Sequence, residues 1–115
     1  MHIVIAADVF KNTLDEILKR TKQRAGTYVW IEAYEGGKVV FKDNRVSLDI
    51  MGTVIDPGNV MIKRINVETF RKALIETGDV SVLTEDKLIC FKQNSFSLRL
   101  DRAVLGENDF KPKRR

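Results

Sequence analysis

One strand pattern occurs twice in the sequence, and this repeat restricts the possible folds more than any other feature. Residues 41–50 are FKDNRVSLDI and residues 91–100 are FKQNSFSLRL, so the same Phe, Lys, Asn, Ser and Leu return fifty positions later. Apolar residues also alternate with polar ones along the second part of both segments, which is typical of a strand with one buried face. We therefore expect two copies of one supersecondary unit, since a solenoid would need at least three repeats.

The first half of the chain has the pattern of a strand, a helix and three further strands. An apolar run at residues 2–6 predicts a buried strand. Helical spacing then predicts a helix over residues 8–23, with Asp8 as its N-cap and Gly26 close to its end. The remaining strands are expected in TYVWIEAY, KVVFKDN and RVSLDIMGTVI, with a hairpin turn at EGGK between the first two.

The same order of elements starts again after the turn at residues 56–58. A strand at NVMIKRI precedes a second helix, with Asn66 as its N-cap and Gly78 at its end. The apolar face of this helix is expected to contain Val67, Phe70, Ala73 and Leu74. Three strands complete the unit, at DVSVLT, KLICFKQ and SFSLRLDR. The predicted fold class is α+β with a tandem βαβββ repeat, in one domain over residues 1–110.

The two pseudo-repeats extend over about residues 1–56 and 57–102 and resemble the repeating domain of DNA sliding clamps. These ring-shaped factors are the DNA polymerase III β subunit in bacteria and proliferating cell nuclear antigen in archaea and eukaryotes. The bacterial clamp is the better match. Residues 57–103 contain, in order, a turn, a strand, a helix with the spacing φ-x-x-L, a strand starting at GDV and a strand with FSL. DFKP at residues 109–112 is similar to the Asp-Phe-Pro that closes many clamp domains, with one residue inserted.

The resemblance implies two helices on one face of antiparallel sheets, and domains joined edge to edge in a ring with the helices toward DNA. Clamp chains contain two or three such domains, whereas this sequence contains one, so a closed ring would need about six copies. The peptide pocket of bacterial clamps involves a junction between consecutive domains of one chain. For that reason, no peptide-binding residues are transferred to this sequence.

The positive charge of the chain is concentrated at its end. Four of the 20 Lys and Arg residues lie in the basic tail, residues 111–115, and the remaining sixteen are matched by 16 Asp and Glu residues. Three lysines lie within one stripe of the first helix, opposite its apolar face. The candidate DNA-binding residues are Lys11, Lys19 and Lys22 on this helix, Arg71 and Lys72 on the second helix, and Lys113, Arg114 and Arg115 in the tail.

Two interpretations of these cations remain open. Phosphate neutralisation requires several cations without acidic neighbours, and a stripe repeated in several copies of the chain would supply them. The alternative is a solvated helix face with ion pairs one turn apart, because Asp15 lies one turn from both Lys11 and Lys19. On the second helix, Glu68 and Glu76 balance the two cations.

The sequence offers little chemistry for catalysis, so we expect no enzyme, no metal and no cofactor. The single histidine is His2, at a strand end, and the single cysteine is Cys90, in an apolar strand. The glycines of EGGK lack the strand–loop–helix context of a phosphate-binding loop. No apolar run is long enough to span a bilayer. One cysteine without a disulfide partner fits a cytoplasmic protein.

Two function classes follow. The first is a clamp-like processivity factor that self-associates through its sheet edges and contacts double-stranded DNA without sequence preference. The second is a phage or mobile-element interaction module with a clamp-like fold, which binds or inhibits a replication or defence enzyme such as a polymerase, a clamp or a nuclease. Tyr28, Trp30, Glu32 and Tyr34 alternate on one strand face, and an exposed Trp30 would mark a partner surface there.

Overall fold

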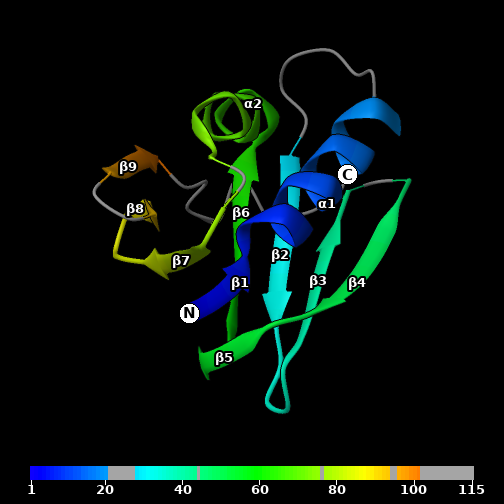
Figure 1. The fold of residues 1–115 in the computed structure, drawn as a ribbon. Helices are drawn as coiled ribbons and strands as arrows, with labels where there is room; N and C mark the ends of the chain where they lie inside the picture. Colours follow the sequence, from blue (N-terminus) through cyan, green and yellow to red (C-terminus); the bar gives the residue numbers. More distant parts are fainter. Residues whose placement is uncertain (21–27, 44, 76, 94–95, 102–115) are drawn as a thin grey trace, which may run out of the picture.

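Two βαβββ units, joined by one additional strand, make up the described chain. The computed structural model describes residues 1–20, 28–43, 45–75, 77–93 and 96–101 (Figure 1). The first unit consists of β1 (His2–Ala6), α1 (Ala7–Arg20), β2 (Tyr28–Ala33), β3 (Lys38–Lys42) and β4 (Ser47–Met51). The second consists of β6 (Gly58–Lys63), α2 (Arg64–Ala73), β7 (Asp79–Thr84), β8 (Leu88–Gln93) and β9 (Phe96–Asp101). The connecting strand is β5 (Thr53–Asp56). The predicted fold class and tandem repeat are confirmed.

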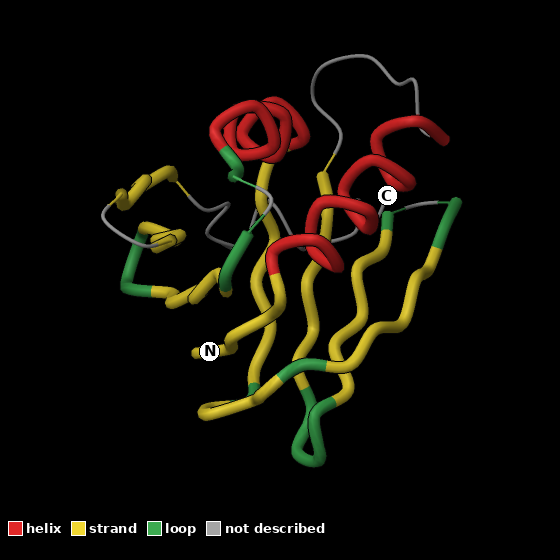
Figure 2. The backbone as a smooth tube through the Cα atoms, viewed as in Figure 1, coloured by secondary structure: helices red, strands yellow, loops and turns green. Residues whose placement is uncertain are grey.

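The two units exchange their first strands. One sheet has the order β4-β3-β2-β6 and the other has the order β5-β1-β7-β8-β9, and all the strand pairs are antiparallel. Figure 2 shows these strands in yellow and the two helices in red. Strand β6 of the second unit therefore completes the sheet of the first, and β1 does the same for the second. Each sheet therefore contains strands from both units.

The strand repeat seen in the sequence is a repeated strand pair in the structure. Phe41 on β3 lies opposite Leu48 on β4, and Phe91 on β8 lies opposite Leu98 on β9. The register is identical in the two sheets. Leu48 and Leu98 are both half-buried against the core. The two leucines therefore occupy equivalent positions on the inner faces of the two sheets.

The repeated phenylalanines meet in one aromatic cluster. The ring centroid of Phe10, from α1, lies 5.3 Å from that of Phe41 and 6.2 Å from that of Phe91. Phe70, from α2, lies 5.2 Å from Phe10 and stacks on Phe91 at 3.9 Å. All four rings are fully buried, so this cluster joins both helices to both sheets in a single core.

Both predicted N-caps are wrong, because each strand continues directly into its helix. Helix α1 starts at Ala7, whose backbone N–H donates to the Gly78 carbonyl oxygen, and Asp8 lies inside the first turn. Helix α2 starts at Arg64 with no side-chain cap, and the Asn66 side chain instead donates to the Asp101 carbonyl oxygen at 3.0 Å. The predicted end of the first helix lies outside the described residues.

The end of α2 also differs from its prediction. The helix stops at Ala73, which is exposed, well before Gly78. A buried side chain, Gln93 of β8, holds the segment that follows. Its amide oxygen accepts from the Ile75 N–H at 2.9 Å, and its amide nitrogen donates to the carbonyl oxygens of Ile75 and Thr77. These bonds replace the glycine cap expected from the sequence.

The segment predicted as one strand, RVSLDIMGTVI, forms two strands in different sheets. The chain leaves β4 at Met51, passes Gly52 and enters β5 of the other sheet. A Cβ atom at Gly52 would lie 3.0 Å from the Val4 carbonyl oxygen and from the Ile5 side chain. A side chain here would require its neighbours on β1 to shift by a few tenths of an ångström, so the absence of a Cβ atom favours glycine at this change of sheet.

Candidate functional site

The surface formed by α1 and α2 is the candidate DNA-contacting face. The two helices pack against each other, and their buried sides face the common core (Figure 1). Together they carry six Lys and Arg residues and four Asp and Glu residues. The net charge of this face is thus only slightly positive, and its character depends on which cations are paired.

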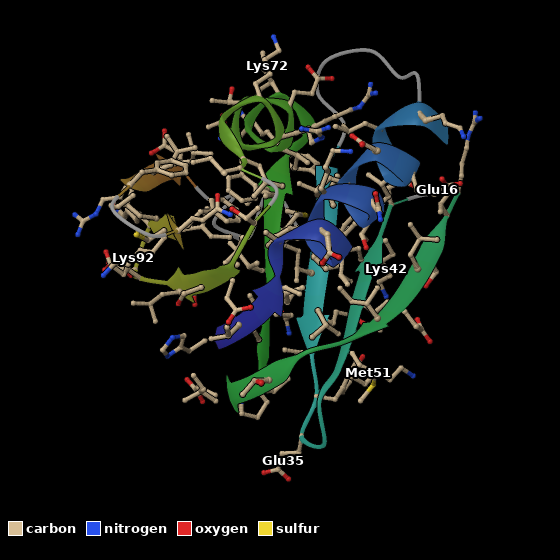
Figure 3. The ribbon with its side chains drawn as sticks, viewed as in Figure 1. Glu16, Glu35, Lys42, Met51, Lys72 and Lys92 are labelled. Atoms are coloured by element: carbon tan, nitrogen blue, oxygen red, sulfur yellow. The ribbon has the colours of Figure 1, made fainter. Side chains whose placement is uncertain are left out.

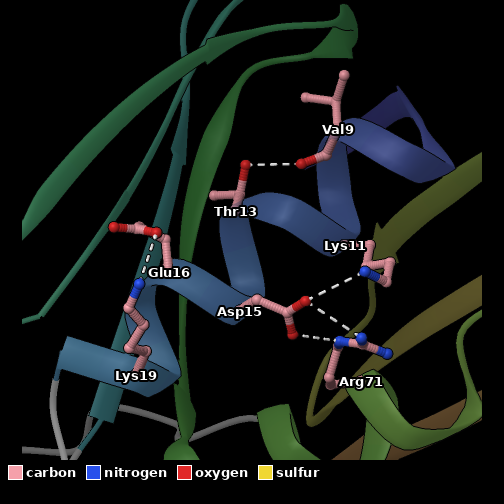
Figure 4. Close-up of polar contacts among 7 residues, drawn as sticks. All are labelled: Val9, Lys11, Thr13, Asp15, Glu16, Lys19 and Arg71. Atoms are coloured by element: carbon pink, nitrogen blue, oxygen red, sulfur yellow. Dashed lines mark hydrogen bonds and ion pairs between the residues drawn. The ribbon is translucent and has the colours of Figure 1, made fainter.

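One carboxylate neutralises two of the predicted cations. Asp15 Oδ1 accepts from Arg71 Nε at 2.5 Å, and Oδ2 accepts from Arg71 Nη2 at 3.2 Å and from Lys11 Nζ at 3.3 Å (Figure 4). The hydrogen bond from Arg71 is the main reason that the pKa of Asp15 lies below its ordinary value. The arginine thereby links α2 to α1, in addition to the predicted pair one turn apart on α1.

The other described cations of this face differ in their pairing. Lys19 extends into solvent and lies 3.9 Å from Glu16 Oε1, so this pair is weak. Arg64 is mostly covered, donates to the Leu18 carbonyl oxygen at 2.9 Å and lies 3.6 Å from Glu68.

Lys72 projects from α2 away from the strands (Figure 3). Within the described part of the chain, no acid lies within ion-pair distance of it. Among the predicted DNA-binding residues, Lys22, Lys113, Arg114 and Arg115 lie outside the described residues. The structure therefore brings Lys11 and Arg71 together at Asp15 and leaves Lys19 and Lys72 apart from them.

The helix face also exposes apolar side chains that a phosphate-binding surface does not need. Ile65, on α2, is 58% exposed, and Ile75, just beyond its end, is 48% exposed. The outward position of Ile75 agrees with the helical spacing of the sequence. Exposed isoleucines near both ends of α2 make this face mixed in character rather than uniformly basic.

The sheets end in strands with one unpaired side within the described residues: β4 and β6 in one sheet, and β5 and β9 in the other. Strands β4 and β9 are the equivalent edges of the two units. Asp49 of β4 lies opposite Val40, and Arg99 of β9 lies opposite Cys90, so the two charged residues occupy matching positions. One open edge therefore carries an acid where its counterpart carries a base.

A polar cluster lies on the outward face of the four-stranded sheet. Glu32 accepts hydrogen bonds from Tyr34 Oη at 2.7 Å and from Lys42 Nζ at 2.9 Å. The Tyr34 hydroxyl is the main cause of the lowered pKa of Glu32. The same carboxylate raises the pKa values of Tyr34 and Lys42 by hydrogen bonding. These contacts fix the side chains around Trp30, which is half-buried at the centre of the face.

The residues considered for other chemistry have ordinary environments. His2 Nε2 lies 3.2 Å from Ser81 Oγ, and the Cys90 thiol is buried. In the ranges that the structure describes, no three His, Cys, Asp or Glu residues are grouped as a metal site would require. None of the described helices combines the length and the apolar character needed to cross a membrane.

The comparisons with known proteins relate this fold to bacterial sliding clamps. No family model and no curated protein matches the sequence. Among solved structures, the Helicobacter pylori beta clamp in complex with 5-chloroisatin superposes with a TM-score of 0.76 at 18% identity, over 90% of this chain and 30% of that one. The same clamp bound to a DNA ligase peptide superposes with a TM-score of 0.76 at 17% identity, over 96% of this chain and 32% of that one. Caulobacter crescentus pol III beta superposes with a TM-score of 0.75 at 16% identity, over 96% of this chain and 31% of that one.

These values show that the chain has the fold of a bacterial clamp domain, as the sequence resemblance predicted. The chain spans only about three-tenths of the length of each of these proteins. At such low identity the likeness concerns the fold and leaves the activity open.

Proposed function

We propose that this protein is a clamp-like factor that self-associates through its sheet edges and contacts double-stranded DNA without sequence preference. The observation that carries the proposal is the charge difference between the equivalent open edges β4 and β9. Asp49 and Arg99 occupy matching positions, so an antiparallel pairing of β4 with β9 of another copy brings opposite charges together. If two β4 edges paired with each other instead, the Asp49 side chains of the two copies would oppose each other.

Such a contact is head-to-tail, so each copy uses two different edges, and the assembly forms a ring where the rotation between copies closes and a filament where it does not. The leucines and isoleucine of these edges are half-buried within one chain and would be covered further by the added strand. Asp49 lies 3.7 Å from Lys38 in the same sheet, and both side chains are more than half exposed, so this pair does not prevent an intermolecular contact. No described acid lies within ion-pair distance of Arg99.

The experiment measures molar mass by light scattering coupled to size-exclusion chromatography. We expect a larger species for the native chain, and mostly monomer for Asp49→Lys and for Arg99→Glu, because each places like charges at the contact. Mixing the two variants should restore association, since the new lysine at position 49 meets the new glutamate at position 99. Lys92→Gln, a charge change on the outward face of the same sheet as Arg99, is the control. A native chain that remains monomeric at high concentration would refute the proposal.

DNA contact is proposed for the helix face and the basic tail. Lys19 and Lys72 are the exposed described cations of this face, and self-association would multiply them. The fold of non-enzymatic clamps supports a binding role rather than catalysis. We place the protein in the cytoplasm, where the single cysteine stays reduced.

A second candidate function is a protein-interaction module that binds a replication or defence enzyme. It is favoured by the exposed Ile65 and Ile75, together with the neutralisation of Lys11 and Arg71 by Asp15. Duplex binding separates the two candidates: a chain that self-associates but does not bind DNA at low salt supports the interaction module.

A further inference from the structure

The four-stranded sheet has an aromatic outward face, on the side away from the core. Along β2, the side chains of Val29, Ile31 and Ala33 are buried inward, so those of Tyr28 and Trp30 point to the opposite side, followed by Tyr34 beyond the strand end. Trp30 makes no hydrogen bond or ring contact with another described residue. Part of its half-buried ring is therefore available to a ligand.

The duplicated fold supplies an internal control for this face. Phe41 of β3 lies opposite Ile31, and Phe91 of β8 lies opposite Val82, so β2 and β7 are equivalent strands. By this register Trp30 corresponds to Ser81, and Tyr28 corresponds to Asp79 in the second unit. The inner positions of Val29 and Ile31 are occupied by Val80 and Val82 in the second unit and remain apolar, whereas the outer ones differ. Because the second sheet forms without these aromatic residues, the fold itself does not require them.

A lysine accompanies each aromatic residue. Lys63 lies opposite Tyr28, Lys42 lies opposite Trp30, and Lys38 Nζ lies 5.8 Å from the centroid of the Tyr34 ring. Lys42 and Lys38 also pair with Glu32 and Asp49, which hold them in place. Lys63 is exposed, and no described acid lies within ion-pair distance of it. Three lysines and two acids give the outward positions of the four strands a small net positive charge.

The surroundings of Trp30 make its ring a fixed part of the surface. Met61 lies opposite it on β6, and Val40 lies on β3 beside Lys42, and both side chains are almost completely buried although they belong to the outward face. They form an apolar floor between the aromatic residues. A ring held this way loses little freedom when a flat ligand stacks on it.

We infer that this face binds single-stranded nucleic acid, with bases stacked on the aromatic residues of β2 and phosphates near the adjacent lysines. Every base has a π-face, so stacking tolerates any sequence, while the lysines follow the negatively charged backbone. A duplex keeps its bases inside and offers only phosphates, for which this face has too few free cations. The site lies on the opposite side of the sheet from the helices and depends neither on self-association nor on duplex binding.

The test uses Trp30 as its own reporter, since it is the single tryptophan of the chain. The full chain is titrated with (dT)12 at low ionic strength while tryptophan fluorescence is recorded, and fluorescein-labelled (dT)12 is followed by anisotropy. We expect saturable quenching by the oligonucleotide and much weaker quenching by a duplex of equal length. Trp30→Leu should weaken binding by about 5- to 150-fold, the range for one lost base stack, whereas Trp30→Phe should retain most of it.

Lys63→Gln keeps the tryptophan and should weaken binding with a flatter salt dependence, whereas the matched control Lys92→Gln, on the outward face of the other sheet, should bind normally. If Trp30→Leu does not fold, quenching of the native chain and the Lys63→Gln comparison still decide the question. Absence of quenching by (dT)12 would overturn the inference. Quenching by an acidic peptide such as poly-Glu but not by (dT)12 would also overturn it and assign the face to a protein partner. A negative result in this test does not contradict the proposed edge contact or the proposed DNA contact of the helix face, because those are tested by molar mass and by duplex binding.

Discussion

Asp15→Asn tests whether the helix face contacts DNA, because this carboxylate opposes two of its cations. Asp15 accepts three hydrogen bonds from Arg71 and Lys11, and the substitution removes the negative charge that opposes these two cations. If the face lies against DNA, two additional phosphate contacts become possible, and the slope of log K against log salt should steepen by about one to two units. Binding to duplexes of any sequence should tighten.

The same substitution should lower the stability of the fold. The Asp15 side chain is 44% exposed, so its ion pairs belong to the surface class, of about 0.2–1 kcal/mol each, with the bidentate arginine near the upper end. We expect a loss of about 1 kcal/mol in the free energy of unfolding, measured by urea denaturation. Stability and DNA affinity thus move in opposite directions, which a general structural defect would not produce.

The pH dependence of this effect has a defined sign. The pKa of Asp15 is lowered in the fold from its ordinary value of 3.8, chiefly by the hydrogen bond from Arg71. A lowered carboxyl pKa contributes stability that is fully present above the unfolded value and is lost as pH falls through the folded one. The stability difference between the native chain and Asp15→Asn should therefore be constant near neutral pH and shrink below pH 3.8.

Asp8→Asn is the matched control for this prediction. Asp8 is an exposed acid on the same helix, its carboxylate accepts a hydrogen bond from the Val9 backbone N–H, and no described cation lies within ion-pair distance of it. The substitution changes the net charge by the same amount without releasing a cation. If both variants bind DNA with the same affinity and salt slope, the helix face is not the DNA-contacting surface, and the reasoning from Asp15 fails.

Three further predictions concern the repeat, the loop after α2 and the basic tail. Leu48→Ala and Leu98→Ala should each cost about 2 kcal/mol, at the low end for core leucines because both are half-buried, and urea denaturation should give similar values for the two equivalent positions. Gln93→Leu should cost about 1–3 kcal/mol and speed amide exchange at Ile75, because the backbone groups of Ile75 and Thr77 lose their buried partners. Replacing Lys11, Lys19 and Lys22 together by Ala should weaken duplex binding and flatten its salt dependence if the helices contact DNA. If only the tail binds, truncation after Phe110 abolishes binding and the triple variant binds normally.

The sequence predicts those parts of the fold in which local pattern and tertiary structure agree. The repeated Phe and Leu pair in the same register in both sheets, and EGGK forms the predicted hairpin turn, with φ of 99° at Gly36 and 104° at Gly37. The change of sheet at Gly52 was not predictable from the alternation of RVSLDIMGTVI. Alternation shows that one face of a strand is buried, but it does not show which sheet the strand joins.

The candidate site shows the same limit. The sequence places Asp15 one turn from Lys11, so that ion pair could be predicted from helical spacing alone. The stronger partner, Arg71, lies on another helix, 56 residues away along the chain. Its contact depends on how α1 and α2 pack, and no local pattern encodes that geometry. For the same reason, the opposite charges of Asp49 and Arg99 can be interpreted only once β4 and β9 are known to be equivalent edges.

Comparison of the two units separates the residues that the fold requires from those available for function. Phe41 and Phe91 fill equivalent places, and substituting either would damage the same core. Asp49 and Arg99 are equivalent in position but opposite in charge, although neither sheet needs a charge there. Like charges at these positions would repel wherever the two positions meet, whereas the opposite charges would favour a contact of β4 with β9 over a contact between two copies of one edge. Divergence between equivalent surface positions is therefore the feature that the two proposed contacts share, at the edges as well as around Trp30.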